Sequence, residues 1–165
     1  MKRFHGEGSS LLRVRDRAMP DLQRAGADDL PAILELLEAS GLPTTDLHPE
    51  GATQFLLLRD GRRLDGVVGL ERYGAVGLLR SLAVRPERRR AGLGIALTEA
   101  LEKLAAASGL TSVVLLTQTA QAFFAERGYR VIARDTVPPA MQSSSQFTSL
   151  CPASAICMRK ELTPG

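Results

Sequence analysis

The stretch LLRSLAVRPERRRAGLGIALTEALEKLAAA, residues 78–107, decides the fold, because it reads as a strand, a basic turn and a long helix. Residues 78–84 are strand-like, and residues 85–94 form the turn. Apolar side chains then recur at helical spacing, which places them on one face of a helix. These are Leu93, Leu97, Ala100, Leu101 and Leu104. The stretch therefore predicts a strand that passes through a tight turn into an amphipathic helix.

The turn has the features of an anion site. The first backbone N–H groups of a helix have no partner inside it, and the helix dipole places partial positive charge there. Gly92 and Gly94 lack a Cβ, so a ligand can approach the backbone closely. Arg88, Arg89 and Arg90 add full charges beside them. Together these features predict a cradle for a phosphate or a pyrophosphate.

The spacing of the residues in the turn limits which phosphate ligand it can bind. No Lys-Ser or Lys-Thr follows the glycines, so a P-loop is excluded, and G-x-G-x-x-G is absent from the turn. What stands there is R-x-x-G-x-G, from Arg89 through Gly92 to Gly94. With the preceding strand and the following helix, it resembles the acetyl-CoA signature of the GNAT (Gcn5-related N-acetyltransferase) family. The alternative is a basic strand-to-helix turn that binds no ligand.

The resemblance implies the fold and the cofactor site. It implies an α/β (α+β) chain with the GNAT fold: a mixed, mostly antiparallel sheet of about seven strands, helices on both faces and a splayed cofactor cleft. The central strand would pair with the pantetheine arm of acetyl-CoA like an added strand, and the N–H near Leu82 would face the thioester oxygen. The implied cofactor-binding residues are Leu82, Ala83, Val84, Arg89, Arg90, Ala91, Gly92, Leu93, Gly94, Ile95 and Phe124.

The remaining chain supplies the other elements in the order of that fold. We expect a flexible arm at 1–20 and a single domain at 21–165, with no internal repeat. A helix should begin at Asp28 or Asp29, with Leu30, Ile33, Leu34 and Leu37 on one face. The other expected elements are strands at 22–25, 55–59, 64–72, 112–117, 129–133 and 154–162, a short helix at 120–127 and a Pro- and Ser-rich connection at 136–145.

The amino-acid composition limits the classes to which the protein can belong. The chain has 165 residues, of which 44% are hydrophobic, which suits one domain with a real core. No apolar run approaches the ~20 residues of a membrane span. The net charge is +3 with 4% aromatics and no Trp, so a nucleic-acid partner is a poor interpretation. Residues 4–10 are not the apolar core of a signal peptide, and two cysteines indicate a reducing cytoplasm.

One position departs from the family pattern. Many GNAT enzymes carry a Tyr four residues before the Gly that ends the short helix, and its phenol protonates the departing thiolate. Here Phe124 stands four residues before Gly128, so the phenol is missing. A thiol with a reference pKa of ~8.5 needs only modest help to leave, from water or a nearby Ser. Tyr73 is a weak substitute, because it lies at or past a strand end.

Three residues on the central strands are candidate catalytic residues: Glu71, Arg80 and Ser81. The acceptor amine must lose a proton to attack, and Glu71 is the candidate base. The alternative is an exposed strand Glu that pairs with Arg72 or Arg80. Arg80 within a sheet needs a partner or a ligand. It would hold an acidic group of the acceptor or, alternatively, form a simple ion pair with Glu71.

Several further segments narrow the resemblance to the ArsN-type acetyltransferases associated with arsenic resistance. They are Gly69–Glu71, Leu79–Leu82, Thr117–Phe124, Gly128–Tyr129, Arg134, Pro138–Pro139, Gln146–Phe147 and Leu150–Ala155. This resemblance implies cytoplasmic detoxification by acetylation of a small molecule's primary amine, with an amino-acid-like arsinate or phosphinate as acceptor. The first helix and the loop at 42–52 would border the acceptor pocket. His48 in that loop is more often simply solvated.

The two cysteines do not predict a metal site. Cys151 and Cys157 lie six residues apart without a nearby His or a third Cys, which is too few ligands for structural zinc. Buried cysteines commonly act as small hydrophobes, although Cys151 could line the acceptor pocket. We therefore expect no metal. A catalytically weak acyl-CoA-binding sensor and an acetyltransferase of a protein amine are the alternative functions, and a homodimer stays open.

Overall fold

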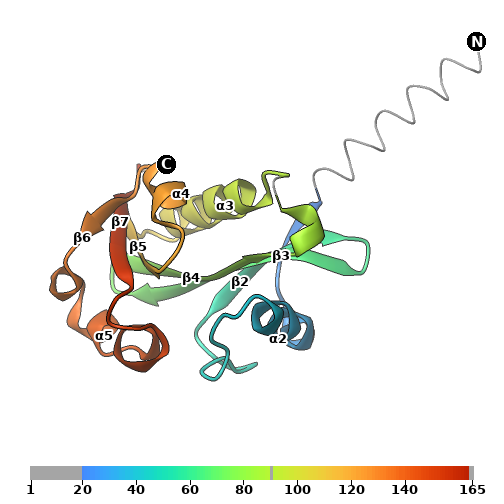
Figure 1. The fold of residues 1–165 in the computed structure, drawn as a ribbon, viewed down its shortest axis with the longest axis horizontal. Helices are drawn as coiled ribbons and strands as arrows, with labels where there is room; N and C mark the ends of the chain where they lie inside the picture. The colour runs from blue at the N-terminus through green and yellow to red at the C-terminus, as the bar shows by residue number, and fades with distance from the viewer. Residues whose placement is uncertain (1–19, 90, 164–165) are drawn as a thin grey trace, which may run out of the picture.

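The computed structural model describes residues 20–89 and 91–163, which contain one seven-stranded sheet (Figure 1). The predicted arm at 1–20 lies, apart from Pro20, outside the described residues. The strands follow the order β1-β2-β3-β4-β5-β7-β6, and all neighbours are antiparallel except β4 and β5. The strands are β1 Asp21–Arg24, β2 Gln54–Asp60, β3 Arg63–Tyr73, β4 Val76–Val84, β5 Ser112–Thr117, β6 Arg130–Ile132 and β7 Ile156–Glu161. The predicted mixed, mostly antiparallel sheet is confirmed.

Helices cover both faces of the sheet. α3 Leu93–Ala107 and α4 Gln121–Ala125 lie on one face, and α2 Leu30–Ala39 and α5 Pro139–Gln142 lie on the other (Figure 1). The alternation of side chains along β2 fits this arrangement, because successive residues of a strand point to opposite faces. Leu56 packs in the apolar cluster of α3, whereas Leu57 packs in that of α2.

The first helix differs slightly from the expectation. Leu30, Ile33 and Leu37 are buried as predicted, but Leu36 is buried in place of Leu34. Asp29 does not cap α2 with its side chain. Its carboxylate instead accepts from the Gly26 amide at 2.7 Å, at the start of the 3-10 turn η1 Ala27–Asp29.

The Pro- and Ser-rich connection at 136–145 contains short helical turns that were not predicted. It begins at the end of η3 Arg134–Thr136, contains α5 and is followed by the π-helix η4 Gln146–Leu150. Pro139 begins α5, where its missing N–H needs no intrahelical partner. Met141 and Phe147 anchor the segment in an apolar cluster with Cys157.

The sheet opens between β4 and β5. These strands pair only where residues 76–78 meet residues 112–114. β5 then continues along β7, with which it pairs over its whole length, while β4 runs on to Val84 without β5. The predicted splay between the central strand and its parallel neighbour is therefore confirmed.

A bulge in β4 lies at this opening. Val67 pairs with Ala83 and Gly69 with Arg80, so Ser81 and Leu82 together oppose the single residue between them on β3. Ser81 adopts φ 59°, the left-handed region that non-glycine residues rarely occupy. A bulge leaves an extra residue without a ladder partner and re-aims its neighbours, so it bends β4 where the two strands separate.

Asp65 on β3 anchors the turn that follows β4. Its carboxylate is fully buried and lies 2.6 Å from Arg63 Nε and 3.4 Å from Arg88 Nε. The Arg85 amide also donates to the Asp65 carbonyl at 2.7 Å. Arg88 was expected to add a full charge to the anion cradle. Its guanidinium also forms an ion pair with Asp65 that holds η2 Pro86–Arg88 against the sheet.

Replacing Asp65 by Asn should lower the free energy of unfolding by about 2–3 kcal/mol, because a buried carboxylate with charged partners is lost. Urea denaturation at pH 7 measures this loss. Asp60→Asn is the matched control, since Asp60 also pairs with Arg63 but its side chain is 42% exposed. It should change stability by less than about 1 kcal/mol. Equal effects of the two substitutions would contradict the role given to Asp65.

Candidate active site

A cavity of about 430 Å³ lies at the N-terminus of α3. It is lined by Val84, Arg88, Arg89, Gly92, Leu93, Gly94, Ile95 and Phe123. The structure thus brings together most of the residues expected to bind the cofactor phosphates. Ala91 lies in the same turn without lining the cavity, and Arg90 lies outside the described residues.

The backbone amides of this turn are available for a ligand. Among the described residues, the amides of 92–95 donate to no protein acceptor, and the first bond into the turn runs from Ala96 to the Gly92 carbonyl at 3.0 Å. Gly92 adopts φ 80°, a conformation that favours glycine. Arg89 donates from Nε to the Val84 carbonyl at 3.2 Å, which holds its charge beside the cavity. These features meet the requirements of an anion site at a helix N-terminus.

A second cavity of about 440 Å³ fills the gap between β4 and β5. Its walls come from both faces of the sheet. Residues 79–82 of β4 and 115–117 of β5 border it, together with Phe124 from the α3 face. From the other face come residues 40–43 after α2, and Gln146, Leu150, Cys151 and Ala155. Of the helix and the loop 42–52 that were expected to border an acceptor pocket, Leu42 and Pro43 line this cavity, and Cys151 lines it too.

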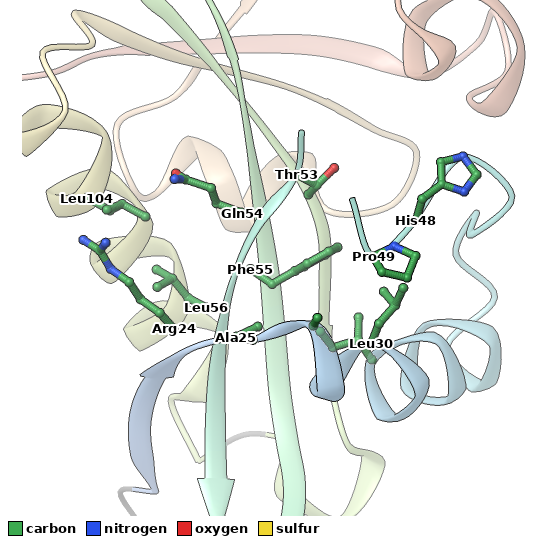
Figure 2. Close-up of a pocket in the computed structure, with 13 residues that line it drawn as sticks. Arg24, Ala25, Leu30, His48, Pro49, Thr53, Gln54, Phe55, Leu56 and Leu104 are labelled. Atoms are coloured by element: carbon green, nitrogen blue, oxygen red, sulfur yellow. The ribbon is translucent and has the colours of Figure 1, made fainter. Parts of the chain in front are cut away.

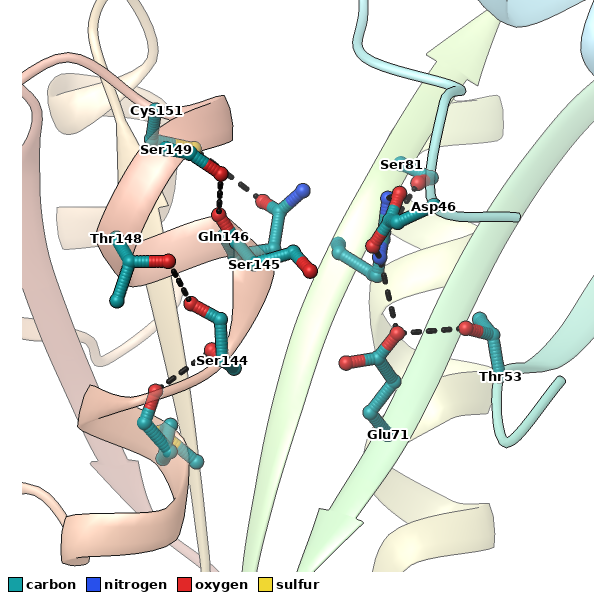
Figure 3. Close-up of polar contacts among 12 residues, drawn as sticks. Asp46, Thr53, Glu71, Ser81, Ser144, Ser145, Gln146, Thr148, Ser149 and Cys151 are labelled. Atoms are coloured by element: carbon teal, nitrogen blue, oxygen red, sulfur yellow. Dashed lines mark hydrogen bonds and ion pairs between the residues drawn. The ribbon is translucent and has the colours of Figure 1, made fainter.

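A network of charged side chains around the buried Arg80 lies behind the β4 wall. The Arg80 side chain is 0% exposed, and its two terminal nitrogens bind both carboxylate oxygens of Asp46, with Nη2 to Oδ1 at 2.8 Å (Figure 3). Nη1 also binds Glu71 Oε2 at 2.9 Å, which confirms the ion pair that was the alternative for both residues. Nε donates to Ser81 Oγ at 3.0 Å. The guanidinium therefore presents no surface to the cavity.

Glu71 is held by three donors. Oε2 accepts from Thr53 Oγ1 at 2.6 Å as well as from Arg80, and Oε1 accepts from the Tyr73 hydroxyl at 2.9 Å. Arg72 does not pair with Glu71; it donates to the Ser108 carbonyl. Burial and then the Glu71 carboxylate raise the pKa of Tyr73 to about 12. Because its proton is directed at Glu71, Tyr73 is poorly placed to protonate a group in the cavity.

Asp46 is the site residue that sequence reasoning missed. Burial acts to raise the pKa of its carboxyl, but the hydrogen bonds and charge of Arg80 outweigh burial and lower it. The same loop carries His48, the residue that drew attention. His48 is exposed, as expected, and lines a different cavity of about 210 Å³ near the start of β2, beside Thr53 and Phe55 (Figure 2). The only signal in the sequence for Asp46 was its position in the loop expected to border the acceptor pocket.

Phe124 fills the position of the missing phenol. Its ring is 4% exposed and packs edge-on against Phe123 and Tyr129, with centroids 5.0 and 5.4 Å away. The Tyr129 hydroxyl donates to Glu102 at 2.9 Å. Burial, reinforced by Glu102, raises the pKa of Tyr129 well above its usual range. Neither described tyrosine lines the cavity between β4 and β5.

The thiols are free, and no metal cluster was found in the described part of the chain. Cys151 is half-buried and Cys157 is buried, and burial raises the pKa of Cys157 to about 11. The described residues contain no group of three or more His, Cys, Asp or Glu that could hold a metal ion. Within the same residues, no helix is both long and apolar enough to cross a membrane.

Comparisons with known proteins agree with this geometry. Residues 51–131 match the family model described as "Acetyltransferase (GNAT) domain". N-acetylglutamate synthase from Neisseria gonorrhoeae, crystallised with coenzyme A and L-arginine, superposes with a TM-score of 0.75 at 20% identity, over 87% of this chain and 33% of that one. Residues 51–131 therefore match an acetyltransferase domain of the GNAT class, and the chain shares the fold of the gonococcal neighbour.

Two curated relatives are similar in sequence. The amino-acid acetyltransferase of Pseudomonas paraeruginosa is 28% identical over 152 residues, which cover 87% of this chain and 35% of the relative. The uncharacterized N-acetyltransferase YjcF of Bacillus subtilis is 32% identical over 85 residues, 51% of this chain and 61% of that protein. The chain therefore spans about a third of the length of the amino-acid acetyltransferase that it matches.

The Asp46–Arg80 pair predicts a dependence of stability on pH. Because the Asp46 pKa is lower in the folded than in the unfolded protein, the stability from this group is fully present above about pH 4 and is lost as pH falls through the folded pKa. Asp46→Asn should therefore lower the free energy of unfolding at pH 7, and the difference from wild type should shrink towards pH 3.

Urea unfolding between pH 7 and pH 3 measures this difference. Asp135→Asn, at an exposed aspartate of η3, should show little difference at any pH. A difference for Asp46→Asn that stays constant across this range would show that the carboxylate is not held by Arg80.

Proposed function

We propose that this protein is an N-acetyltransferase that moves the acetyl group of acetyl-CoA to the primary amine of a small molecule. The observation that carries the proposal is that two features lie next to each other. The amides of the turn at the start of α3 are unpaired, and the sheet is open between β4 and β5 beside that turn. GNAT enzymes use acetyl-CoA as the acetyl donor, and the gonococcal neighbour was crystallised with coenzyme A.

The cofactor would lie along the β4 side of the gap. Its diphosphate would accept hydrogen bonds from the amides of 92–95, with the charges of Arg89 and Arg90 beside it and Ala91 completing the turn. Its pantetheine arm would pair with the backbone of Leu82, Ala83 and Val84, where β4 has lost β5 as a partner. The thioester would then reach the bulge, with Phe124 packed beside it.

The reaction would join the amine nitrogen to the thioester carbon and break the carbon–sulfur bond. The Leu82 amide would stabilise the developing oxyanion. Glu71 does not line the cavity, so it would take the amine proton through a water molecule. Arg80 would act as a positioning residue that holds Glu71 and Asp46, in place of the expected contact with the acceptor.

Ser81 would assist the departing thiolate in place of the missing phenol. Its Oγ lies on the cavity wall and accepts from Arg80 Nε, so its own hydroxyl proton remains free to be donated. This role requires only a hydrogen bond, because a thiolate with a conjugate acid near pKa ~8.5 is a stable leaving group.

The proposed acceptor class rests on sequence similarity. Similarity to the amino-acid acetyltransferases favours an amino-acid-like acceptor. The resemblance to ArsN-type proteins favours an arsinate or phosphinate analogue and a role in arsenic resistance. The free thiols fit the reducing cytoplasm that this role implies. These assignments form part of the proposal.

Glu71→Gln should lower kcat for CoA release by about 100-fold with little change in KM for acetyl-CoA, because only proton removal is affected. A thiol-reactive dye follows CoA release with amino acids, phosphinothricin, arsinothricin and polyamines as acceptors. The Phe124 position favours one competing function, an acyl-CoA-binding sensor. Binding of acetyl-CoA without CoA release for any of these amines would favour the sensor.

Gly94→Ala should weaken binding of the cofactor without changing the stability of the fold. A Cβ at Gly94 would meet only the Phe123 ring, at an ordinary 3.5 Å, so the protein should keep its melting temperature. The same methyl group would stand in the cradle and weaken CoA binding by at least about tenfold, or ~1.4 kcal/mol. Calorimetric titration with CoA measures the affinity. Unchanged affinity would place the diphosphate elsewhere.

A further inference from the structure

The cavity between β4 and β5 contains a buried side chain that the proposed chemistry does not use. Gln146, on the π-helix η4, is 8% exposed and lines the cavity wall opposite β4. Figure 3 shows its amide nitrogen pointing across the gap towards the strands that carry Ser81 and Glu71. Glutamine is rarely buried unless its polar atoms are used, so this placement requires an explanation.

A neighbouring thiol fixes the orientation of this amide. Cys151 donates from Sγ to Gln146 Oε1 at 3.3 Å, and the Cys151 amide donates to the Gln146 carbonyl. Burial raises the pKa of the Cys151 thiol despite the opposing charges of Arg134 and Arg80, so the group stays protonated and acts as the donor. With Oε1 committed to the thiol, Nε2 is directed into the cavity.

The amide nitrogen has no protein partner. Among the described residues, Gln146 Nε2 donates to no acceptor. Nε2 is not among the buried unpaired side-chain atoms of the described residues, so this nitrogen is accessible from the cavity, where a ligand oxygen can accept from it. An amide can donate two hydrogen bonds from Nε2, which suits a planar or tetrahedral oxyacid.

The charged side chains around the cavity make its β4 wall more negative than its Gln146 wall. Behind the Gln146 wall lies Arg134, which donates to the carbonyls of Pro152 and Ala155 and has no ion pair with a described carboxylate. Behind the β4 wall, the two carboxylates of Asp46 and Glu71 outnumber the one guanidinium of Arg80. An amino acid would therefore orient with its ammonium towards β4 and its acidic group towards Gln146.

We propose that Gln146, held by Cys151, is a positioning residue that binds an oxygen of the acceptor's acidic group. This inference rests on the proposed acetyltransferase function and names the acceptor class: an amine that also carries a carboxylate, phosphinate or arsinate. It also explains how an acidic acceptor is held although Arg80 is fully occupied by protein carboxylates.

The test compares paired probes. L-glutamate and aminomethylphosphinate provide the acidic group, and n-butylamine and methylamine lack it. Calorimetry on the CoA-loaded protein measures binding, and CoA release from acetyl-CoA measures turnover. Gln146→Leu should weaken binding of the acidic probe that wild type binds best, and raise its KM, by about 10- to 100-fold while kcat changes little. The non-acidic amines should be affected less than twofold.

Three further variants make the result specific. Gln146→Glu keeps the shape but adds a like charge, so it should reverse the preference for acidic probes. Cys151→Ser keeps a donor to Oε1 and should retain affinity, whereas Cys151→Ala should lose several-fold. Ser149→Ala, an exposed residue of the same π-helix, is the matched control and should match wild type.

The outcomes separate this inference from the proposed function. Equal losses for acidic and non-acidic amines in Gln146→Leu, or no binding of an acidic probe to wild type at millimolar concentration, would overturn the role of Gln146. CoA release with non-acidic amines alone would overturn it while leaving the acetyltransferase proposal intact. Acidic-probe binding that depends on Gln146 without any CoA release would support the subsite and reject the acetyltransferase.

Discussion

The way β5 divides its pairing between β7 and β4 determines the architecture of the site. β5 pairs with β7 along all of its residues but with β4 over only three pairs, so the second half of β4 has an unsatisfied edge facing the gap. An unpaired strand edge inside a protein needs a partner, and an extended ligand can supply one. The bulge at Ser81 lies where the strands part, and Ser81 lines the cavity there.

The arginines of the turn after β4 have different tasks, although the sequence presents them as one cluster. Arg88 is held by Asp65 beneath the turn, which fixes the entry of the chain into α3. The Arg89 side chain donates to the Val84 carbonyl and lies on the cavity wall. The turn held by Asp65 and the unpaired amides at the start of α3 together form a preorganised anion cradle.

The sequence was sufficient for features that depend on local pattern. The apolar spacing of 93–104 and the glycines at 92 and 94 predicted α3 and its amide turn, and strand alternation predicted the sheet. It was insufficient for contacts between distant segments. Asp46 lies 34 residues from Arg80 in a loop without periodicity, so a buried Arg signalled that a partner exists without identifying it. Gln146 entered the sequence analysis only as part of a segment that resembles a family, because its contact with Cys151 depends on the π-helix η4, which the sequence did not predict.

The most direct test of the central claim is an amide NMR titration of the protein with CoA. If the unpaired amides at the start of α3 grip the diphosphate, the resonances of Gly92 to Ile95 should shift most, together with those of Leu82 to Val84 along the open edge of β4. Adenosine 3′,5′-bisphosphate, which lacks the diphosphate and the pantetheine arm, should leave the β4 resonances unshifted. Shifts confined to other parts of the sheet, with these two segments unchanged, would contradict the account.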